Sequence, residues 1–126
     1  MNFKIKATVF GGAADRNVSA YSGKLLNDTD LYVALPARIH GPRRKVKVTN
    51  HNDHSKSAIA SIEDVGPWNT NDPYWAGNRR PQAEVGIDMR GRTTNGAGID
   101  LSPALARALG IDGMGYVDWE FVGEIA

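Results

Sequence analysis

Residues 99–103 (IDLSP) and residues 64–67 (DVGP) are the two short motifs that decide the fold of this chain. The first opens a short helix, because serine is a good N-cap and proline suits the first helical position. The second ends a strand-like run, since glycine and proline together favour a turn. Asp100 and Asp64, one in each motif, flank a long loop rich in aromatic, amide and arginine side chains. Two acidic residues beside an aromatic loop are what a site for a sugar polymer needs.

Alternating apolar and polar residues predict short strands on both sides of these motifs. We expect strands over residues 3–10, 31–35, 45–49, 57–62 and 116–122, with a polar hairpin loop over residues 50–55. We also expect a helix over residues 104–109 that ends at Gly110, and an irregular loop over residues 68–97. Mostly short strands with one small helix predict a closed β-barrel or a sandwich.

The composition limits the possible functions. A chain of 126 residues favours one domain, residues 1–126, with a modest core and no room for a cofactor domain. The net charge of +1 gives no global field that points to nucleic acid or an acidic membrane. The absence of cysteine excludes disulfides and thiolate metal sites. No stretch is apolar enough for a signal peptide or a membrane span.

Several short segments in a fixed order carry a resemblance to a known family. They are residues 7–11 (ATVFG), 34–36 (ALP), 45–50 (KVKVTN), 64–67 (DVGP), 99–102 (IDLS) and 109–110 (LG), followed by Gly113 and Val117. Together they run nearly from end to end, and the chain resembles the RlpA-like double-psi β-barrel family. That family is related to expansins and to membrane-bound lytic transglycosylase A.

The resemblance implies a mainly β fold, a six-stranded double-psi β-barrel with one short helix and residues 68–97 as a long inserted loop. It also implies action on peptidoglycan, with a groove lined by the DVGP and IDLS segments. Asp100 aligns with the acid/base carboxylate of the transglycosylase and expansin relatives, and Asp64 is carried over from DVGP. Tyr32 stands where RlpA-like members usually have histidine, and the inserted loop is longer than theirs, which implies a different substrate surface.

The chemistry of glycan cleavage makes specific demands on these aspartates. A proton donor must stand beside the bridging oxygen, and a dry site or a second carboxylate raises the pKa of such a donor. The helix start would lower the pKa of Asp100, whereas a nearby Asp64 would counter that effect. As an alternative, both aspartates brace their turns by accepting backbone N–H bonds.

Aromatic and amide side chains of the loop are the candidates for substrate binding. Trp68, Tyr74 and Trp75 offer apolar platforms for sugar rings, Asn69 offers an amide for hydroxyl groups, and Tyr32 joins them through the resemblance. As an alternative, one or two of the rings fold inward and fasten the loop to the barrel.

A metal site is not expected from the sequence. His51 and His54 share one hairpin, but no third ligand stands at a useful spacing, and zinc sites normally use three or four protein ligands. Asp118 and Glu120 alternate with apolar residues on the last strand and are interpreted as a solvated face. We therefore expect neither a metal nor a cofactor.

The leading hypothesis is an enzyme that cleaves the glycan strands of peptidoglycan, like a lytic transglycosylase. The alternatives are a non-catalytic polysaccharide-binding module of expansin type and an interaction domain unrelated to carbohydrate. We expect a monomer at the bacterial cell wall or periplasm, without membrane insertion and without nucleic acid. The missing signal peptide fits an enzyme of phage or prophage type.

Overall fold

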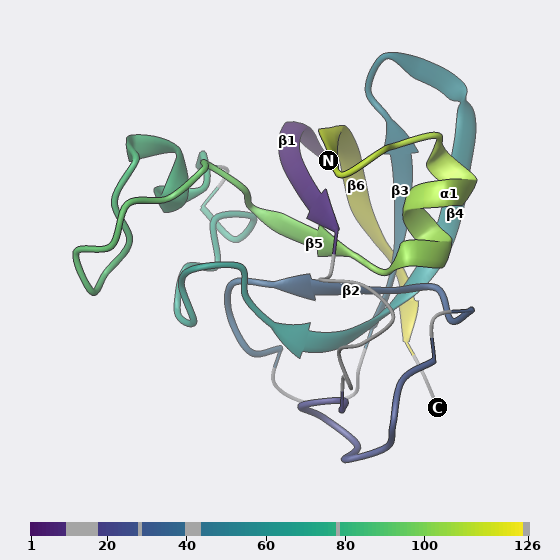
Figure 1. Ribbon diagram of the computed structural model, residues 1–126, viewed down its shortest axis with the longest axis horizontal. Coiled ribbons are helices and arrows are strands. Elements are labelled where there is room, and N and C mark those ends of the chain that lie inside the picture. The colour runs from purple at the N-terminus through teal and green to yellow at the C-terminus, as the bar shows by residue number, and fades with distance from the viewer. Residues whose placement is uncertain (10–17, 28, 40–43, 78, 125–126) are drawn as a thin grey trace.

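The computed structural model describes residues 1–9, 18–27, 29–39, 44–77 and 79–124. Within these residues, six strands close a barrel in the order β1-β5-β2-β4-β3-β6, accompanied by one α-helix and one 3₁₀-helix (Figure 1). The elements are β1 (Asn2–Val9), β2 (Tyr32–Leu35), β3 (Arg44–Asn50), β4 (Asp53–Val65), η1 (Gln82–Val85), β5 (Ile99–Leu101), α1 (Pro103–Leu109) and β6 (Met114–Glu124). The predicted mainly β class, a closed six-stranded barrel with one short α-helix, is confirmed across the described residues.

Two parallel pairings shape the barrel. β1 pairs with β5 and β2 pairs with β4 in parallel, while β2–β5, β3–β4, β3–β6 and β1–β6 are antiparallel. Parallel neighbours cannot be joined by a tight hairpin, and in each of these two pairs the chain forms other strands between the two partners. As a result β2 lies between β4 and β5, the two strands that carry the DVGP and IDLS motifs.

The barrel interior follows from the alternation of apolar residues along the strands. Ile5, Val33, Val48 and Val117 are buried there, and Trp119 is the bulkiest fully buried side chain among the described residues. Inward residues alternate with outward ones because successive side chains of a strand point to opposite faces. The strands predicted from this pattern are confirmed, and β6 extends beyond its predicted ends.

The hairpin between β3 and β4 is tighter than predicted. Asn50 already pairs with Asp53, so residues 51–52 alone form the turn and β4 begins within the segment predicted as loop. His51 therefore lies in the turn itself, and His54 is the second residue of β4.

The helix α1 begins and ends as its sequence predicts. The Ser102 side chain accepts a hydrogen bond from the N–H of Leu105, and Pro103 occupies the first turn. Gly110 takes the left-handed conformation that ends the helix, with φ of 69°. Residues 99–101, which we had placed at the helix entry, instead form the short strand β5. No helix among the described residues has the length and apolar character to cross a membrane.

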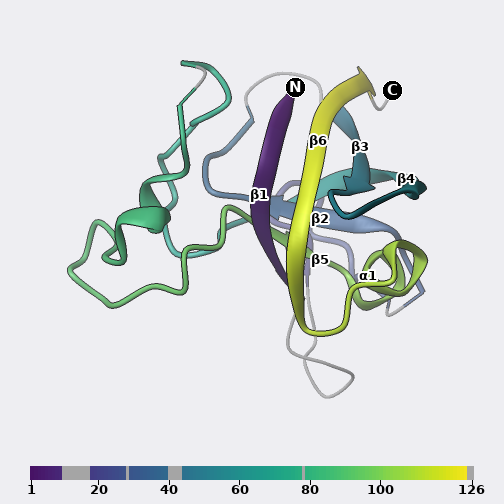
Figure 2. The same cartoon turned by 90° about the horizontal axis from the view of Figure 1, so that it is seen from above.

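The inserted segment forms a lobe beside the barrel, and we call residues 68–77 and 79–97 the lobe (Figures 1 and 2). In both views it extends to one side of the strands. Buried carboxylates organise it: Asp72 accepts from the N–H of Gln82 at 2.7 Å, and Asp88 accepts from the N–H groups of Arg90 and Arg92 at 2.9 and 2.8 Å. The lobe is thus irregular, as predicted, but internally hydrogen-bonded.

The lobe is fastened to the barrel at several points. The Tyr74 hydroxyl donates to the carbonyl of Gly98 at 2.9 Å and accepts from the Trp119 indole at 2.9 Å. Gly98 leaves no room for a side chain, because a Cβ there would lie 2.6 Å from the Pro81 ring. The Arg80 guanidinium donates to two carbonyls of β1 at 2.7 Å each. These contacts hold the lobe beside the DVGP and IDLS segments.

Candidate functional site

Asp64 and Asp100 lie on the same face of the sheet, on either side of Ala34. Ala34 of β2 pairs with Asp64 of β4 and also with Asp100 of β5, and Thr8 of β1 pairs with Asp100 in turn. Paired residues of neighbouring strands direct their side chains to the same face. We call Thr8, Asp100, Ala34 and Asp64 the carboxylate row. The two aspartates, distant along the chain, are therefore neighbours across one small alanine.

The carboxylate row faces away from the barrel interior. Val33, Leu35, Ile99 and Leu101 point into the core, and the alternating positions between them point outward. Asp64 and Asp100 are half-buried, so both keep some contact with solvent. The row consequently lies on the outer, partly exposed side of the sheet.

The surroundings of Asp100 favour the protonated form of its carboxyl. Burial raises its pKa above the ordinary value, and the negative charge of Asp64 adds to that rise. The Thr8 hydroxyl donates a hydrogen bond to the Asp100 carboxylate, which works in the opposite direction. The expected lowering by the helix start does not prevail, because desolvation is the largest effect on this carboxyl.

Asp64 is positioned by the turn that follows it. Its carboxylate accepts a hydrogen bond from the N–H of Val65 at 2.8 Å. The N–H of Gly66 donates to the carbonyl of Leu35 at 3.0 Å, which ties the turn to the end of β2. The bond to Val65 is the local bracing that we weighed as an alternative role, and it leaves Asp64 close enough to influence Asp100.

Tyr32 and Tyr74 do not line a surface groove, which corrects our expectation for both. Tyr32 is 1% exposed and Tyr74 is 0% exposed. Burial raises the pKa of the Tyr74 hydroxyl, and its two hydrogen bonds fasten the lobe to the barrel. Tyr74 therefore has the inward stapling role that we gave as the alternative for these rings.

Trp75 lies in an aromatic cluster that extends the core. It packs edge to face with Tyr74, Trp119 and Phe121 at centroid distances of 5.0, 5.6 and 6.2 Å. The ring is half-buried, so one part of it still reaches the surface. The Trp75 ring is thus packed against the hydrophobic core and not presented mainly to solvent.

Trp68 and Asn69 line a pocket of about 360 Å³ in the lobe. The Trp68 indole donates to Asn95 at 2.9 Å, and the Arg92 guanidinium lies 5.9 Å from the centre of its ring. The Asn69 amide is engaged within the lobe, with Gln82 at 2.6 Å and the N–H of Met89 at 3.0 Å. The described lining of this pocket does not include either aspartate of the carboxylate row.

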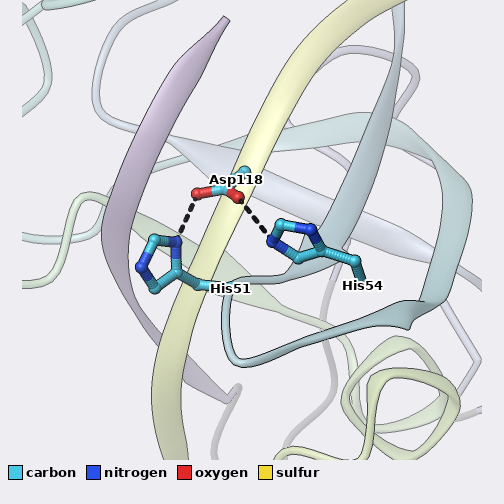
Figure 3. A group of neighbouring side chains, drawn as sticks. All are labelled: His51, His54 and Asp118. Carbon is cyan, nitrogen blue, oxygen red and sulfur yellow. Dashed lines mark hydrogen bonds and ion pairs between the residues drawn. The ribbon is translucent and has the colours of Figure 1, made fainter.

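Thr8 and Asp118 are two residues that the sequence analysis did not select. Thr8 reaches Asp100 through the parallel pairing of β1 and β5, a register that no local pattern reveals. Asp118 is buried, 5% exposed, rather than solvated as expected, and it lies between His51 and His54 (Figure 3). These three are the described residues that group as possible metal ligands.

The fold and the carboxylate row together define a small β-barrel protein with a candidate acid–base site on its outer face. The chain belongs to the family DUF8814, described as a domain of unknown function, whose sequence profile matches residues 1–120. The match includes the DVGP and IDLS motifs and the whole lobe. No curated protein matches the chain.

Proposed function

We propose that this protein cleaves the glycan strands of peptidoglycan by acid–base catalysis, in the manner of a lytic transglycosylase. The observation that carries the proposal is the pairing of Asp100 and Asp64 across Ala34, with the pKa of Asp100 raised by burial and by the charge of Asp64. A raised pKa favours the protonated carboxyl, which is the form that glycosidic cleavage requires.

Asp100 is the acid and then the base of the proposed reaction. Its proton passes to the bridging glycosidic oxygen as the bond from that oxygen to the anomeric carbon breaks. The resulting Asp100 carboxylate then takes the proton of the 6-hydroxyl on the sugar that carries this anomeric carbon. The hydroxyl oxygen bonds to the anomeric carbon and gives an anhydro product. The Thr8 hydrogen bond supports the second role, because it favours the ionised carboxylate.

Asp64 has an electrostatic role in this proposal. Its negative charge favours protonated Asp100 before cleavage and then stabilises positive charge that develops on the sugar ring. The N–H of Val65 orients the Asp64 carboxylate. Loss of the Asp64 charge should therefore lower activity less than loss of the Asp100 proton.

The lobe pocket suits the acidic parts of the same polymer. Arg90 and Arg92 line this pocket together with Trp68, and the Arg92 guanidinium is paired with Asp88, so the exposed Arg90 guanidinium is the one placed to pair with carboxylates such as those of lactyl groups and stem peptides. Trp68 follows the DVGP motif directly, so a glycan chain bound at the carboxylate row could continue to this pocket. The lobe would then hold the substrate while the row performs the chemistry.

The test uses purified sacculi and measures soluble anhydro-muropeptides by mass spectrometry. We expect release by the unaltered protein, loss of release in Asp100→Asn, and a smaller loss in Asp64→Asn. Asp112→Asn is the matched control, because Asp112 is exposed and lies outside the carboxylate row. A folded protein that releases nothing from sacculi at any pH would refute the enzyme.

A polysaccharide-binding module is the second candidate. Thr8 already bonds Asp100 and Val65 already bonds Asp64, contacts that suit a fixed binding surface as well as a reacting one. This candidate predicts that the protein sediments with sacculi without releasing fragments. Failure to bind sacculi at all would leave an interaction domain of another kind.

A further inference from the structure

His51, His54 and Asp118 bring three metal-ligating side chains together on the outer surface of the barrel. The His51 Nδ1 atom lies 2.9 Å from Asp118 Oδ1, and the His54 Nε2 atom lies 3.6 Å from Asp118 Oδ2. One ligand atom from each residue lies within 4.8 Å of the other two. Figure 3 shows the two rings on either side of the carboxylate, with both imidazoles directed at it.

The backbone fixes Asp118 at the centre of this group. The pairing of β1 with β6 shifts between Asn2 and Ile5, and Lys4 in that break has a positive φ of 50°. The break directs the N–H of Lys4 to the Asp118 carboxylate at 2.8 Å. Asp118 is therefore oriented by a backbone donor, as metal-ligating carboxylates usually are.

The histidines come from the tight hairpin between β3 and β4. His51 is in the two-residue turn, and its N–H donates to the carbonyl of Tyr116 on β6 at 3.0 Å. His54 is the second residue of β4, and its side chain is 72% exposed. One imidazole is thus held against β6, and the other is free to adjust its position around an ion.

We propose that His51, His54 and Asp118 bind one divalent transition-metal ion, with zinc the best match. Two imidazoles and one carboxylate form a donor set that zinc uses, whereas magnesium and calcium prefer oxygen ligands alone. Ligand atoms about 2.0–2.1 Å from a tetrahedral zinc lie about 3.3 Å apart. The observed separations, 2.9 Å to Oδ1 of Asp118 and 3.6 Å to Oδ2, are near that value, and all three ligand atoms lie within 4.8 Å of one another, so a small rotation of the exposed His54 ring would complete the site.

The ion would keep an open coordination position. Three protein ligands leave a fourth position for water or another molecule, the pattern of reactive rather than purely structural zinc sites. A pocket of about 240 Å³ adjoins His54 and Asp118 and is also lined by Phe3, Lys47 and Thr49. The Lys47 amine makes a small anion, such as a carboxylate, the best-suited occupant of that position.

This site is independent of the proposed glycan cleavage, since it shares no residue with the carboxylate row. The first experiment titrates Zn²⁺ into metal-stripped protein by calorimetry. We expect one ion per chain, with a rise of several degrees in Tm that Mg²⁺ does not produce. Co²⁺ in place of zinc should give the visible absorption of a four- or five-coordinate site, and added acetate should alter it. Absence of saturable zinc binding at millimolar concentration would overturn the proposal.

Three variants locate the ion. His54→Ala removes an exposed ligand without disturbing the core, and Asp118→Asn keeps the shape of the carboxylate while removing its charge. Each should weaken zinc binding by at least about 100-fold, since even outer-shell partners of a metal site are worth 10–100-fold. Asp112→Asn, a change at an exposed carboxylate outside this group, should leave the affinity unchanged. Equal affinity in His54→Ala would show that the ion binds elsewhere.

Discussion

The barrel and the lobe are built by different forces. The barrel strands bury alternating apolar side chains around Trp119, so its stability comes mainly from the removal of apolar surface from water. The lobe is organised by buried Asp72 and Asp88, whose carboxylates accept backbone N–H bonds. An apolar core tolerates small changes at many positions, whereas a carboxylate-centred loop depends on a few acceptors. Substitutions in the two regions should therefore differ in how much stability they remove and in how many residues they affect.

The largest effect should come from the barrel core. Trp119→Ala removes the bulkiest fully buried side chain and the indole donor to Tyr74, and should lower the free energy of unfolding by about 3–5 kcal/mol. Chemical denaturation followed by circular dichroism measures the loss. Trp68→Ala, which removes a half-buried indole from the lobe, is the matched control and should cost less. Similar losses in the two variants would contradict the distinction between the regions.

Loss of a hydrogen-bond acceptor in the lobe should lower the free energy of unfolding by less, and the effect should be confined to the lobe. Asp72→Ala leaves the N–H of Gln82 without its partner and removes the contact with Arg79 at 3.4 Å, at a cost of about 1–3 kcal/mol. Hydrogen exchange should accelerate at residues 79–97 while the strands of the barrel remain protected. Asp112→Asn should change neither region. Uniform acceleration in the strands would mean that the lobe and barrel unfold as one unit.

The contact between the regions can be weakened separately. Arg80→Ala removes the hydrogen bonds to the carbonyls of Phe3 and Lys4 and the ion pair with Glu84, at a cost of about 1 kcal/mol because the side chain is largely exposed. Limited proteolysis should then cut the lobe faster, with Arg90→Ala as the control. An unchanged rate of proteolysis would mean that the contacts of Tyr74 and Gly98 hold the lobe to the barrel without Arg80.

The sequence predicted the barrel better than the lobe, for a physical reason. Alternation marks a strand wherever one face is buried, and the Ser102 and Gly110 caps mark a helix through local bonds. Residues 99–101 are too few to show any period, so β5 was read as a helix entry. The inward turn of Tyr74 depends on contacts with Gly98 and Trp119 that no local pattern contains.

The candidate sites show the same division. The motifs selected Asp64 and Asp100 correctly as neighbours, but their common partner Ala34 follows from strand register, which is not visible in a single sequence. Asp118 was read as solvated because it alternates with buried residues. It is covered because the register break at Lys4 and the hairpin histidines converge on it.

The smallest expected change in stability is a gain, in Asp100→Asn, and it tests whether Asp100 serves function or structure. Because its pKa is higher in the folded than in the unfolded chain, the native state binds more protons between those two values, and stability falls as the pH rises through that range. Asp100→Asn cannot ionise, and its amide oxygen can still accept from Thr8. Its Tm should therefore exceed that of the unaltered protein at pH 7, and the difference should vanish near about pH 3, below the unfolded pKa.

Thermal unfolding across that pH range measures the effect, with Asp112→Asn as a control that should show no pH-dependent difference. If Asp100→Asn gains stability and loses cleavage, Asp100 is a proton donor that lowers the stability of the fold, as residues that perform chemistry often do. A loss of stability at pH 7 would instead mean that the ionised carboxylate is needed by Thr8. Asp100 would then be a brace between β1 and β5, and the acid of the proposed reaction would have to be sought elsewhere.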